Sequence, residues 1–182
     1  MILSNCPITK SDAKVLKECV MSTSDPLYRT YREFHTGVDL ETKDVYSMYD
    51  GTVVYVGQND KKQYSVIIQT GSSLCICYRW LNSISVRAGL SISAQQYIGE
   101  VKKYVHVESY NNIQSNWAVR IGKQDWYKFN IMSVFDGTYV QSVDPGQLAT
   151  NLESNEDDIS DYDSAMLDVI TEDFIKEHSN NT

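Results

Sequence analysis

The sequence predicts a mainly β protein, an antiparallel β sandwich, and three observations support this class. From residue 28 to about residue 140 the chain runs in short segments rich in β-branched and aromatic residues. Gly, Asn and Asp recur between these segments at the spacing expected of turns. The 182 residues, 42% of them hydrophobic, suffice for one domain with its own core and a tail.

The elements are expected in the following order. Residues 11–21 carry an amphipathic helical pattern with Ser11 as a candidate N-cap, so residues 1–27 are predicted to be an N-terminal helical segment. Residues 28–143 are predicted to be the β domain. Its expected strands lie within residues 52–56, 65–69, 74–81, 84–86, 97–101 and 104–110, and residues 116–129 are expected to add one more hairpin.

The composition changes after residue 143. Residues 1–143 hold 13 acidic and 15 basic residues, for a net charge of +2, whereas residues 144–182 hold 11 acidic residues and one basic residue, for a net charge of −10. Residues 151–161 are predicted to be a solvated acidic linker. Beyond it, helical spacing predicts an acidic amphipathic helix over about residues 160–177. This helix either packs on its own domain or docks on a partner protein through Tyr162, Met166, Val169, Ile170 and Phe174.

Composition also excludes some classes of function. The acidic balance and the scattered Lys and Arg residues argue against a nucleic-acid partner. No apolar run approaches the roughly 20 residues of a membrane-spanning helix. The N-terminus lacks the pattern of a signal peptide, so synthesis in the cytoplasm without Sec-type export is expected. Cys75 and Cys77 would share one face of a strand, and reduced structural thiols are favoured over a metal-binding pair.

Three residues form the strongest candidate site. His35 precedes Asp39 by four residues around Gly37, and His106 lies on a predicted strand. Two imidazoles and a carboxylate can hold zinc and leave a fourth position open. The same residues can instead make a hydrogen bond within a turn and fill an ordinary half-buried strand position. The third histidine, His178, lies in the terminal tail and is expected to be inert.

Several segments follow one another in the order of a known family's motifs. Residues 32–40 contain a His-x-x-x-Asp motif around a glycine, and residues 45–57 contain Asp-Gly-x-Val. Residues 78–81 are similar to a Tyr-x-His-Leu motif, and residues 104–108 are similar to a His-x-His motif followed by Glu. Residues 28–108 therefore resemble the lysostaphin-type (LytM-type) zinc metallopeptidases, endopeptidases that cut peptidoglycan cross-bridges. The resemblance implies the fold of that family and implies zinc ligands at His35, Asp39 and His106.

Two positions depart from the family pattern. The resemblance places the family's catalytic histidines at Trp80 and Tyr104. Proton transfer at neutral pH needs a group that exchanges protons there, and each such group contributes about 10²–10⁴-fold to rate. An indole has no basic site, and a phenol ordinarily titrates near pH 10. The resemblance thus implies a catalytic site that is not intact, whose aromatic side chains either fill the cleft or receive a peptide or glycan.

The expected function is a non-catalytic structural or assembly protein built on a degenerate peptidoglycan-endopeptidase fold. Since no signal peptide is found, the expected setting is a bacteriophage tail or baseplate, with the acidic helix bound to another virion protein. One alternative is an active, divergent zinc peptidoglycan endopeptidase of a virion. Another is a module that binds peptidoglycan or regulates an amidase.

Overall fold

The computed structural model describes residues 1–111, 116–121 and 128–136, and all structural statements concern these residues. Three short helices lie among them, and none is long and apolar enough to cross a membrane. The elements, in chain order, are β1 (Ile2–Cys6), β2 (Ser11–Lys17), α1 (Pro26–Tyr31), β3 (Val38–Glu41), β4 (Asp44–Tyr46), β5 (Gly51–Gln58), β6 (Tyr64–Thr70), β7 (Leu74–Leu81), β8 (Ser83–Ile84), β9 (Ser91–Ile92), β10 (Tyr97–Glu100), β11 (Tyr104–Tyr110), α2 (Trp117–Arg120), β12 (Lys128–Phe129) and α3 (Met132–Phe135).

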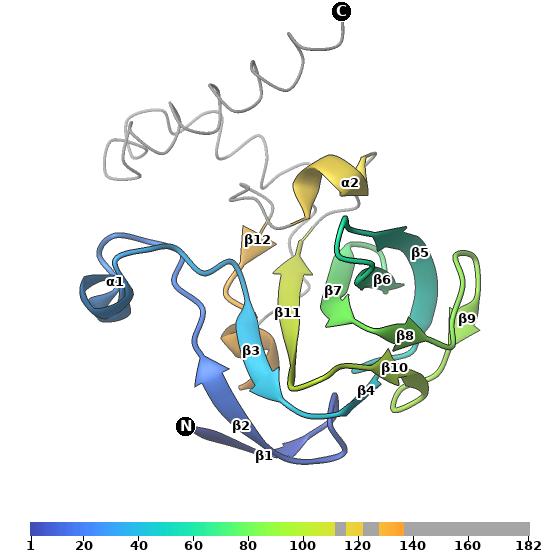
Figure 1. Cartoon of the computed structure of the whole chain (residues 1–182), viewed down its shortest axis with the longest axis horizontal. Coiled ribbons are helices and arrows are strands. Elements are labelled where there is room, and N and C mark those ends of the chain that lie inside the picture. The colour runs from blue at the N-terminus through green and yellow to red at the C-terminus, as the bar shows by residue number, and fades with distance from the viewer. Residues whose placement is uncertain (112–115, 122–127, 137–182) are drawn as a thin grey trace, which may run out of the picture.

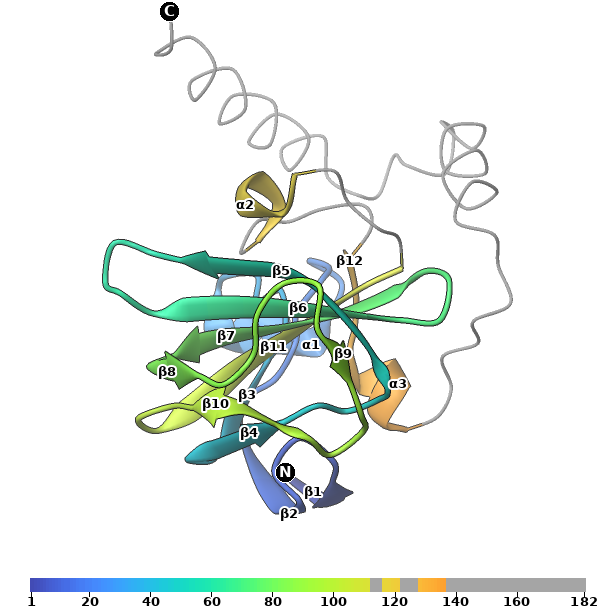
Figure 2. The same ribbon diagram turned by 90° about the vertical axis from the view of Figure 1, so that its right-hand side faces the viewer.

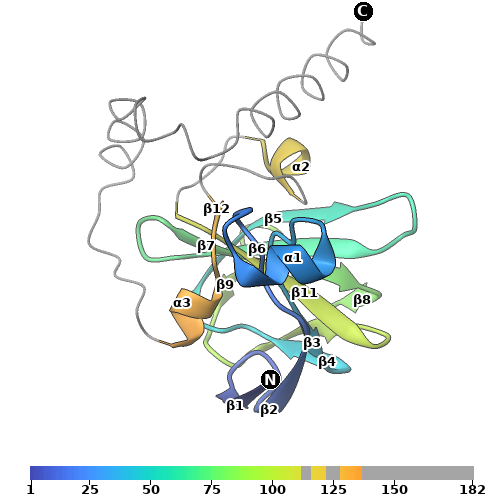
Figure 3. The same ribbon diagram turned by 90° about the vertical axis from the view of Figure 1, so that its left-hand side faces the viewer.

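Two antiparallel sheets make up the domain. The large sheet has the order β1-β2-β3-β11-β7-β6-β5-β9, with β12 paired to β11, and the small sheet has the order β4-β10-β8. The large sheet is strongly curved, and the small sheet lies beside its concave side (Figures 1 and 2). Helix α1 lies on the outside of the domain, in front of the large sheet in Figure 3. The predicted class, a mainly β protein with antiparallel sheets, is confirmed.

The main hydrophobic core unites both sheets. It contains Leu40 of β3 and Val107 of β11 from the large sheet together with Val45 and Ile98 from the small one, all fully buried. Alternate residues of each strand point into this core because successive side chains of a strand face opposite sides. The remaining residues of β7 and β11 therefore face the other side of the large sheet.

A second, smaller cluster covers that outer side. Cys75 and Cys77 of β7 pack there with Tyr110 of β11 and Trp117 of α2. The two cysteines share one face, as their spacing predicted, and both are buried. The outer side of the large sheet is thus itself buried where α2 covers it.

The helix predicted over residues 11–21 is wrong, because residues 11–17 form strand β2. Ala13 and Val15 are buried while Lys14 between them is exposed, which is the two-residue period of a strand. Pairing with β1 and β3 overrides the weaker helical stripe. The helix of this segment, α1, begins later, where the Asp25 side chain accepts a hydrogen bond from the backbone N–H of Leu27 at 2.9 Å.

The predicted hairpin over residues 116–129 is wrong in its first half, where residues 117–120 form α2. Its last two residues do form a strand, β12, which pairs with β11. The predicted acidic linker and terminal helix, with the docking side chains Tyr162, Met166, Val169, Ile170 and Phe174, lie outside the described residues. These expectations, and the boundary at residue 143, stay predictions.

Candidate metal centre

Antiparallel pairing of β3 with β11 brings the candidate ligands together. Asp39 lies directly opposite His106 in this register. His35 precedes β3 and is fixed by two backbone hydrogen bonds with Val20. Gly37 separates the two ligands of this segment, and a Cβ atom there would lie 2.2 Å from the carbonyl oxygen of Val107. Only glycine allows the chain to approach β11 so closely.

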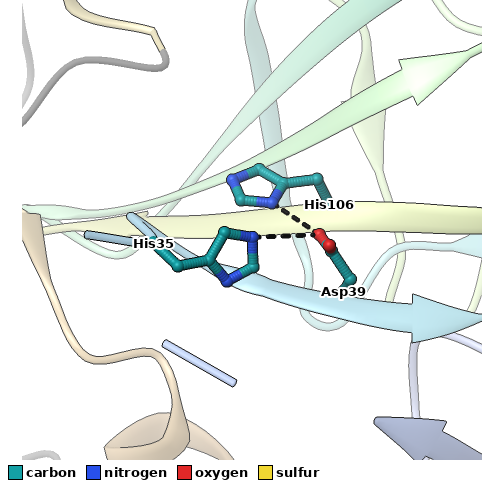
Figure 4. Close-up of side chains that lie close together, drawn as sticks. All are labelled: His35, Asp39 and His106. Atoms are coloured by element: carbon teal, nitrogen blue, oxygen red, sulfur yellow. Dashed lines mark hydrogen bonds and ion pairs between the residues drawn. The ribbon is translucent and has the colours of Figure 1, made fainter. Parts of the chain in front are cut away.

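The three side chains converge on one point (Figure 4). Asp39 Oδ1 lies 2.7 Å from His106 Nδ1 and 3.3 Å from His35 Nε2. One ligand atom from each residue lies within 4.8 Å of the others. The side chains of His106 and Asp39 are 5% and 13% exposed, so the cluster is largely shielded from water.

Each histidine is oriented by its second nitrogen. His35 Nδ1–H donates a hydrogen bond to the carbonyl oxygen of Glu18 at 2.9 Å. His106 Nε2–H donates to Glu108 Oε1 at 3.0 Å. A neutral ring with its proton on this outer nitrogen would present the lone pair of its other nitrogen to a metal beside Asp39. Metal-binding histidines in proteins are fixed in this way by a carbonyl or carboxylate partner. Without a metal, the 2.7 Å contact between His106 Nδ1 and Asp39 Oδ1 is a hydrogen bond that His106 donates.

Glu108 is the centre of a buried polar network. Its Oε1 accepts hydrogen bonds from Thr36 Oγ1 at 2.6 Å and, more weakly, from Arg79 Nη1 at 3.5 Å, besides the one from His106. Its Oε2 accepts from the hydroxyl of Tyr110 at 2.9 Å. The side chain is fully buried, so these partners take the place of water. The network fixes the carboxylate that in turn fixes the His106 ring.

The electrostatics of the cluster suit a bound cation. Burial alone would raise the pKa of Asp39, but hydrogen bonds from His106 and His35 outweigh it and bring the pKa to about 2. Burial alone would lower the pKa of His106, but Asp39 and Glu108 outweigh it and raise the pKa. Without a metal, the charged form of His106 is therefore favoured, because both of its ring nitrogens face a carboxylate oxygen. The proton between His106 and Asp39 occupies the place where a cation would neutralise Asp39.

The chain fits zinc by the chemistry of its donor set. Two imidazole nitrogens and a carboxylate oxygen are ligands that zinc accepts, with bonds of about 2.0–2.2 Å. Tetrahedral bonds of that length separate ligand atoms by about 3.3 Å. The distance between Asp39 and His35 matches this value, and the shorter distance between Asp39 and His106 is that of the direct hydrogen bond. His35 Nε2, Asp39 and His106 Nδ1 would hold the ion.

A β-bulge shapes one side of the centre. Tyr64 pairs with Leu81 and Val66 pairs with Tyr78, so β7 holds one residue more than β6 between these pairs. The extra residue is Trp80, whose φ of 69° is rare for a bulky side chain. In consequence Arg79 and Trp80 both reach outer-side residues: Arg79 contacts Glu108, and Trp80 lies near His106.

The two aromatic residues at the expected catalytic positions lie beside the ligands. The Trp80 ring centroid is 6.3 Å from that of His106, and Tyr104 precedes His106 by two residues on β11. Both line a pocket of about 250 Å³. Among the described residues, its lining consists of Lys61, Gln63, Trp80, Asn82, Lys102, Lys103 and Tyr104.

Sequence reasoning missed the residues that support the ligands. Two signals pointed to Glu108: it is the Glu that follows the His-x-His motif, and the period of a strand places it on the same side as His106. Nothing in the sequence singled out Thr36 or Arg79, which reach Glu108 from positions 72 and 29 residues away.

Part of the chain matches the model of a known protein family. Residues 33–114 match the family model described as Peptidase family M23, a stretch that includes all three candidate ligands as well as Trp80 and Tyr104. A search of the curated proteins found no match.

Solved structures show the same fold at low sequence identity. The antimicrobial peptidase lysostaphin from Staphylococcus simulans is 17% identical with a TM-score of 0.50, and the match covers 73% of this chain and 53% of lysostaphin. LytU is 13% identical with a TM-score of 0.50, over 69% of this chain and 86% of that one. A chain of the SpoIIIAH and SpoIIQ complex is 19% identical with a TM-score of 0.50, and the match covers 67% of this chain and 92% of that one. This chain thus spans about half the length of lysostaphin.

Proposed function

We propose that the chain uses its domain of lysostaphin-like fold as a zinc-holding assembly module that does not cleave peptidoglycan. Residues 33–114 of this domain match the Peptidase family M23 model. The observation that carries this proposal is the pairing of an ordered ligand triplet with two aromatic side chains beside it. His35, Asp39 and His106 keep their orienting partners, whereas Trp80 and Tyr104 occupy the adjoining pocket wall.

The proposal is supported by the residues next to the metal centre, where the described part of the chain places no further histidine and no accessible carboxylate besides the ligands themselves. Of the three histidines in the sequence, two are the candidate ligands and His178 lies outside the described residues. Glu108 is fully buried and accepts hydrogen bonds through both oxygens, so it cannot reach a substrate. Trp80 offers one fixed N–H donor and no acceptor.

When bound at such a site, zinc supplies Lewis acidity toward a carbonyl oxygen. The residues of this chain would orient the ligands and exclude water from them. Hydrolysis needs in addition a group that takes up and returns a proton, which contributes about 10²–10⁴-fold. Without that group, a metal held at this centre would still cross-link the segment before β3 to β11.

We further propose that the module acts in a larger assembly, the tail or baseplate of a bacteriophage. The predicted terminal helix would then bind a neighbouring virion protein. The strong charge difference between residues 1–143 and residues 144–182 supports a separate role for the tail.

Hydrolysis of purified peptidoglycan tests the proposal. The full chain, loaded with zinc to one equivalent by direct metal analysis, is expected to release no cleavage products. The double variant Trp80→His/Tyr104→His is expected to gain chelator-sensitive cleavage, and adding His106→Ala should abolish that gain. The matched control Trp117→His changes an aromatic residue outside the centre and should gain nothing.

Cleavage by the unaltered chain would overturn the proposal if a chelator and His106→Ala both stop it. That result would establish the alternative, an active divergent endopeptidase in which the Tyr104 hydroxyl assists. Failure of the unaltered chain to bind zinc would overturn the metal-holding part.

A further inference from the structure

The pocket beside the metal centre is lined by three lysines and, among the described residues, by no acidic one. Lys61 comes from the turn between β5 and β6, while Lys102 and Lys103 come from the turn between β10 and β11. Both turns lie at the same end of the domain (Figure 2). Asp60 is exposed next to Lys61 in the chain but does not line the pocket. The lining therefore favours a negatively charged ligand.

The three lysines are available to such a ligand. All three residues are exposed, and no ion pair within the described ranges involves them. Hydrogen bonds hold both turns. Asn59 Oδ1 accepts from the backbone N–H groups of Lys61 and Gln63, both at 3.0 Å. The carbonyl oxygen of Lys103 accepts from the backbone N–H of Thr42 at 3.1 Å. The ammonium groups thus extend from backbone that is already ordered.

Two aromatic rings and two amides form the rest of the lining. The Trp80 ring is held from one side, because the Arg79 guanidinium carbon lies 4.2 Å from the ring centroid in the geometry of a cation–π contact. Gln63 Oε1 accepts a hydrogen bond from Asn59 Nδ2 at 3.2 Å, which leaves the Gln63 NH₂ group as a donor for a ligand. Amides bind hydroxyl groups and aromatic faces pack against C–H groups, so this lining suits a ring that carries hydroxyls.

The size of the pocket limits the ligand. Its volume of about 250 Å³ lies just below the roughly 300–1,000 Å³ of sites for drug-sized molecules. One sugar ring with one charged group is of the right size, and any longer chain would extend outside the pocket.

Three ammonium groups match a phosphate better than a carboxylate. An ammonium is a compact point charge, whereas a carboxylate is best matched by the planar fork of an arginine. A phosphate monoester carries about −1.5 to −2 charges near pH 7 and has three terminal oxygens, one for each lysine.

We propose that the pocket binds a sugar that bears a phosphate monoester, either as a free sugar phosphate or at the end of a glycan. Lys61, Lys102 and Lys103 hold the phosphate, and the ring packs against Trp80 and Tyr104. The proposal goes beyond the assembly role and does not depend on whether the centre holds metal or cleaves peptidoglycan.

NMR titration of the full chain tests the proposal, after metal has been removed by a chelator and dialysis so that no ion binds the phosphate. The probe is glucose 6-phosphate, compared with glucose, inorganic phosphate and glucuronate. We expect glucose 6-phosphate to shift the Trp80 indole signal and the amide signals of Lys61, Lys102 and Lys103 with a Kd of about 0.1–1 mM. Inorganic phosphate and glucuronate should bind about tenfold more weakly, and glucose should shift none of these signals. Glucuronate that binds as tightly as glucose 6-phosphate overturns the choice of phosphate.

Neutral variants provide the matched control. Lys61→Gln/Lys102→Gln/Lys103→Gln should weaken the binding of glucose 6-phosphate at least about tenfold. The same change at exposed basic residues outside the lining should leave the Kd unchanged, in Lys14→Gln/Arg29→Gln/Arg87→Gln. Asn82→Ala should weaken glucose 6-phosphate but not inorganic phosphate, because the amide contacts only the sugar. Absence of shifts at the pocket signals, or one Kd in both triple variants, overturns the proposal.

Two further ligands identify the source of the phosphate. An oligosaccharide with one terminal phosphate that binds more tightly than glucose 6-phosphate assigns the pocket to the end of a glycan, and equal or weaker binding assigns it to a free sugar phosphate. Single-stranded nucleic acid also combines stacking on aromatic rings with lysine contacts to phosphate. A short single-stranded oligothymidine that binds more tightly than both sugars through the same signals would overturn the proposal.

Discussion

Replacing Glu108 with glutamine should weaken zinc binding while leaving the fold intact. The carboxylate is fully buried and accepts the His106 Nε2–H bond at 3.0 Å. A glutamine oxygen in place of Oε1 keeps the acceptor for His106 and Thr36, and the Tyr110 hydroxyl can turn to accept from the new NH₂ group. The substitution therefore removes the charge and keeps the shape.

The magnitude follows from the loss of a charged partner. Removing the carboxylate that orients a metal-binding histidine typically costs 10–100-fold in affinity, or about 1.4–2.7 kcal/mol. Since Gln preserves the hydrogen bond, Glu108→Gln should lie near the tenfold end, and Glu108→Leu near or beyond the hundredfold end. Both substitutions also remove the negative charge that faces Arg79, which should lower the free energy of unfolding by about 1–3 kcal/mol.

The assay is competition with a chelator of known affinity, together with chemical unfolding of the metal-free protein. Tyr110→Phe is the matched control, because it removes one hydrogen bond to Glu108, at a cost of about 1 kcal/mol in stability, without contacting His106. The reasoning is refuted if Glu108→Gln binds zinc as tightly as the unaltered chain. It is equally refuted if Tyr110→Phe weakens zinc binding as much as Glu108→Gln does.

Four other perturbations have defined outcomes. Gly37→Ala should lower the free energy of unfolding, measured by chemical unfolding, by about 1–3 kcal/mol or more, because its Cβ would lie 2.2 Å from the Val107 carbonyl oxygen. A variant of unchanged stability would contradict the close approach of Gly37 to β11. Zinc at about 1,000 times its Kd should raise the free energy of unfolding by about 4 kcal/mol, and His35→Ala should abolish this gain; equal stabilisation of that variant would exclude His35 as a ligand. Zinc affinity should fall as pH decreases, beginning above pH 6.5, because the raised pKa of His106 makes the metal compete with a proton. Calorimetry at several pH values measures this, and a zinc affinity that does not change with pH would contradict it. Burial raises the pKa of the Cys75 thiol to about 12, above that of an unfolded thiol near 9. This thiol should therefore contribute its full stabilisation below pH 9, and the free energy of unfolding should fall by about 4 kcal/mol as pH rises toward 12. The fall should be shallower in Cys75→Ala, and identical alkaline unfolding curves would contradict this.

Local patterns predicted the strands that carry the site. The alternation of Val105 and Val107 with His106 indicated a strand with one apolar side, and the structure has Val105 and Val107 in the core and His106 on the outer side. The grouping of His35, Asp39 and His106 also followed from sequence, through the family motifs. Both patterns are either local or preserved in order along the chain.

Features that depend on pairing between distant segments were not predicted. The apolar residues near Val15 fit a helical stripe, and only the presence of β1 and β3 on either side makes a strand the better solution. The bulge at Trp80 arises from the register between β6 and β7, which no single segment reveals. The partners of Glu108 were hidden for the same reason, since Thr36 meets it across the β3–β11 pairing.

The bulge in β7 has a consequence for how this protein can vary. Tyr78 and Leu81 both point into the core, and they would do so in a regular strand if one residue between them were absent. Trp80 is thus an inserted position that the sheet does not require, held at a φ that costs about 1–3 kcal/mol. Its side chain faces the metal centre and the pocket, so substitution or even deletion there would alter the centre while keeping the register of every core residue. Substitutions at position 80 can therefore change the chemistry of the centre without disturbing the packing of the core.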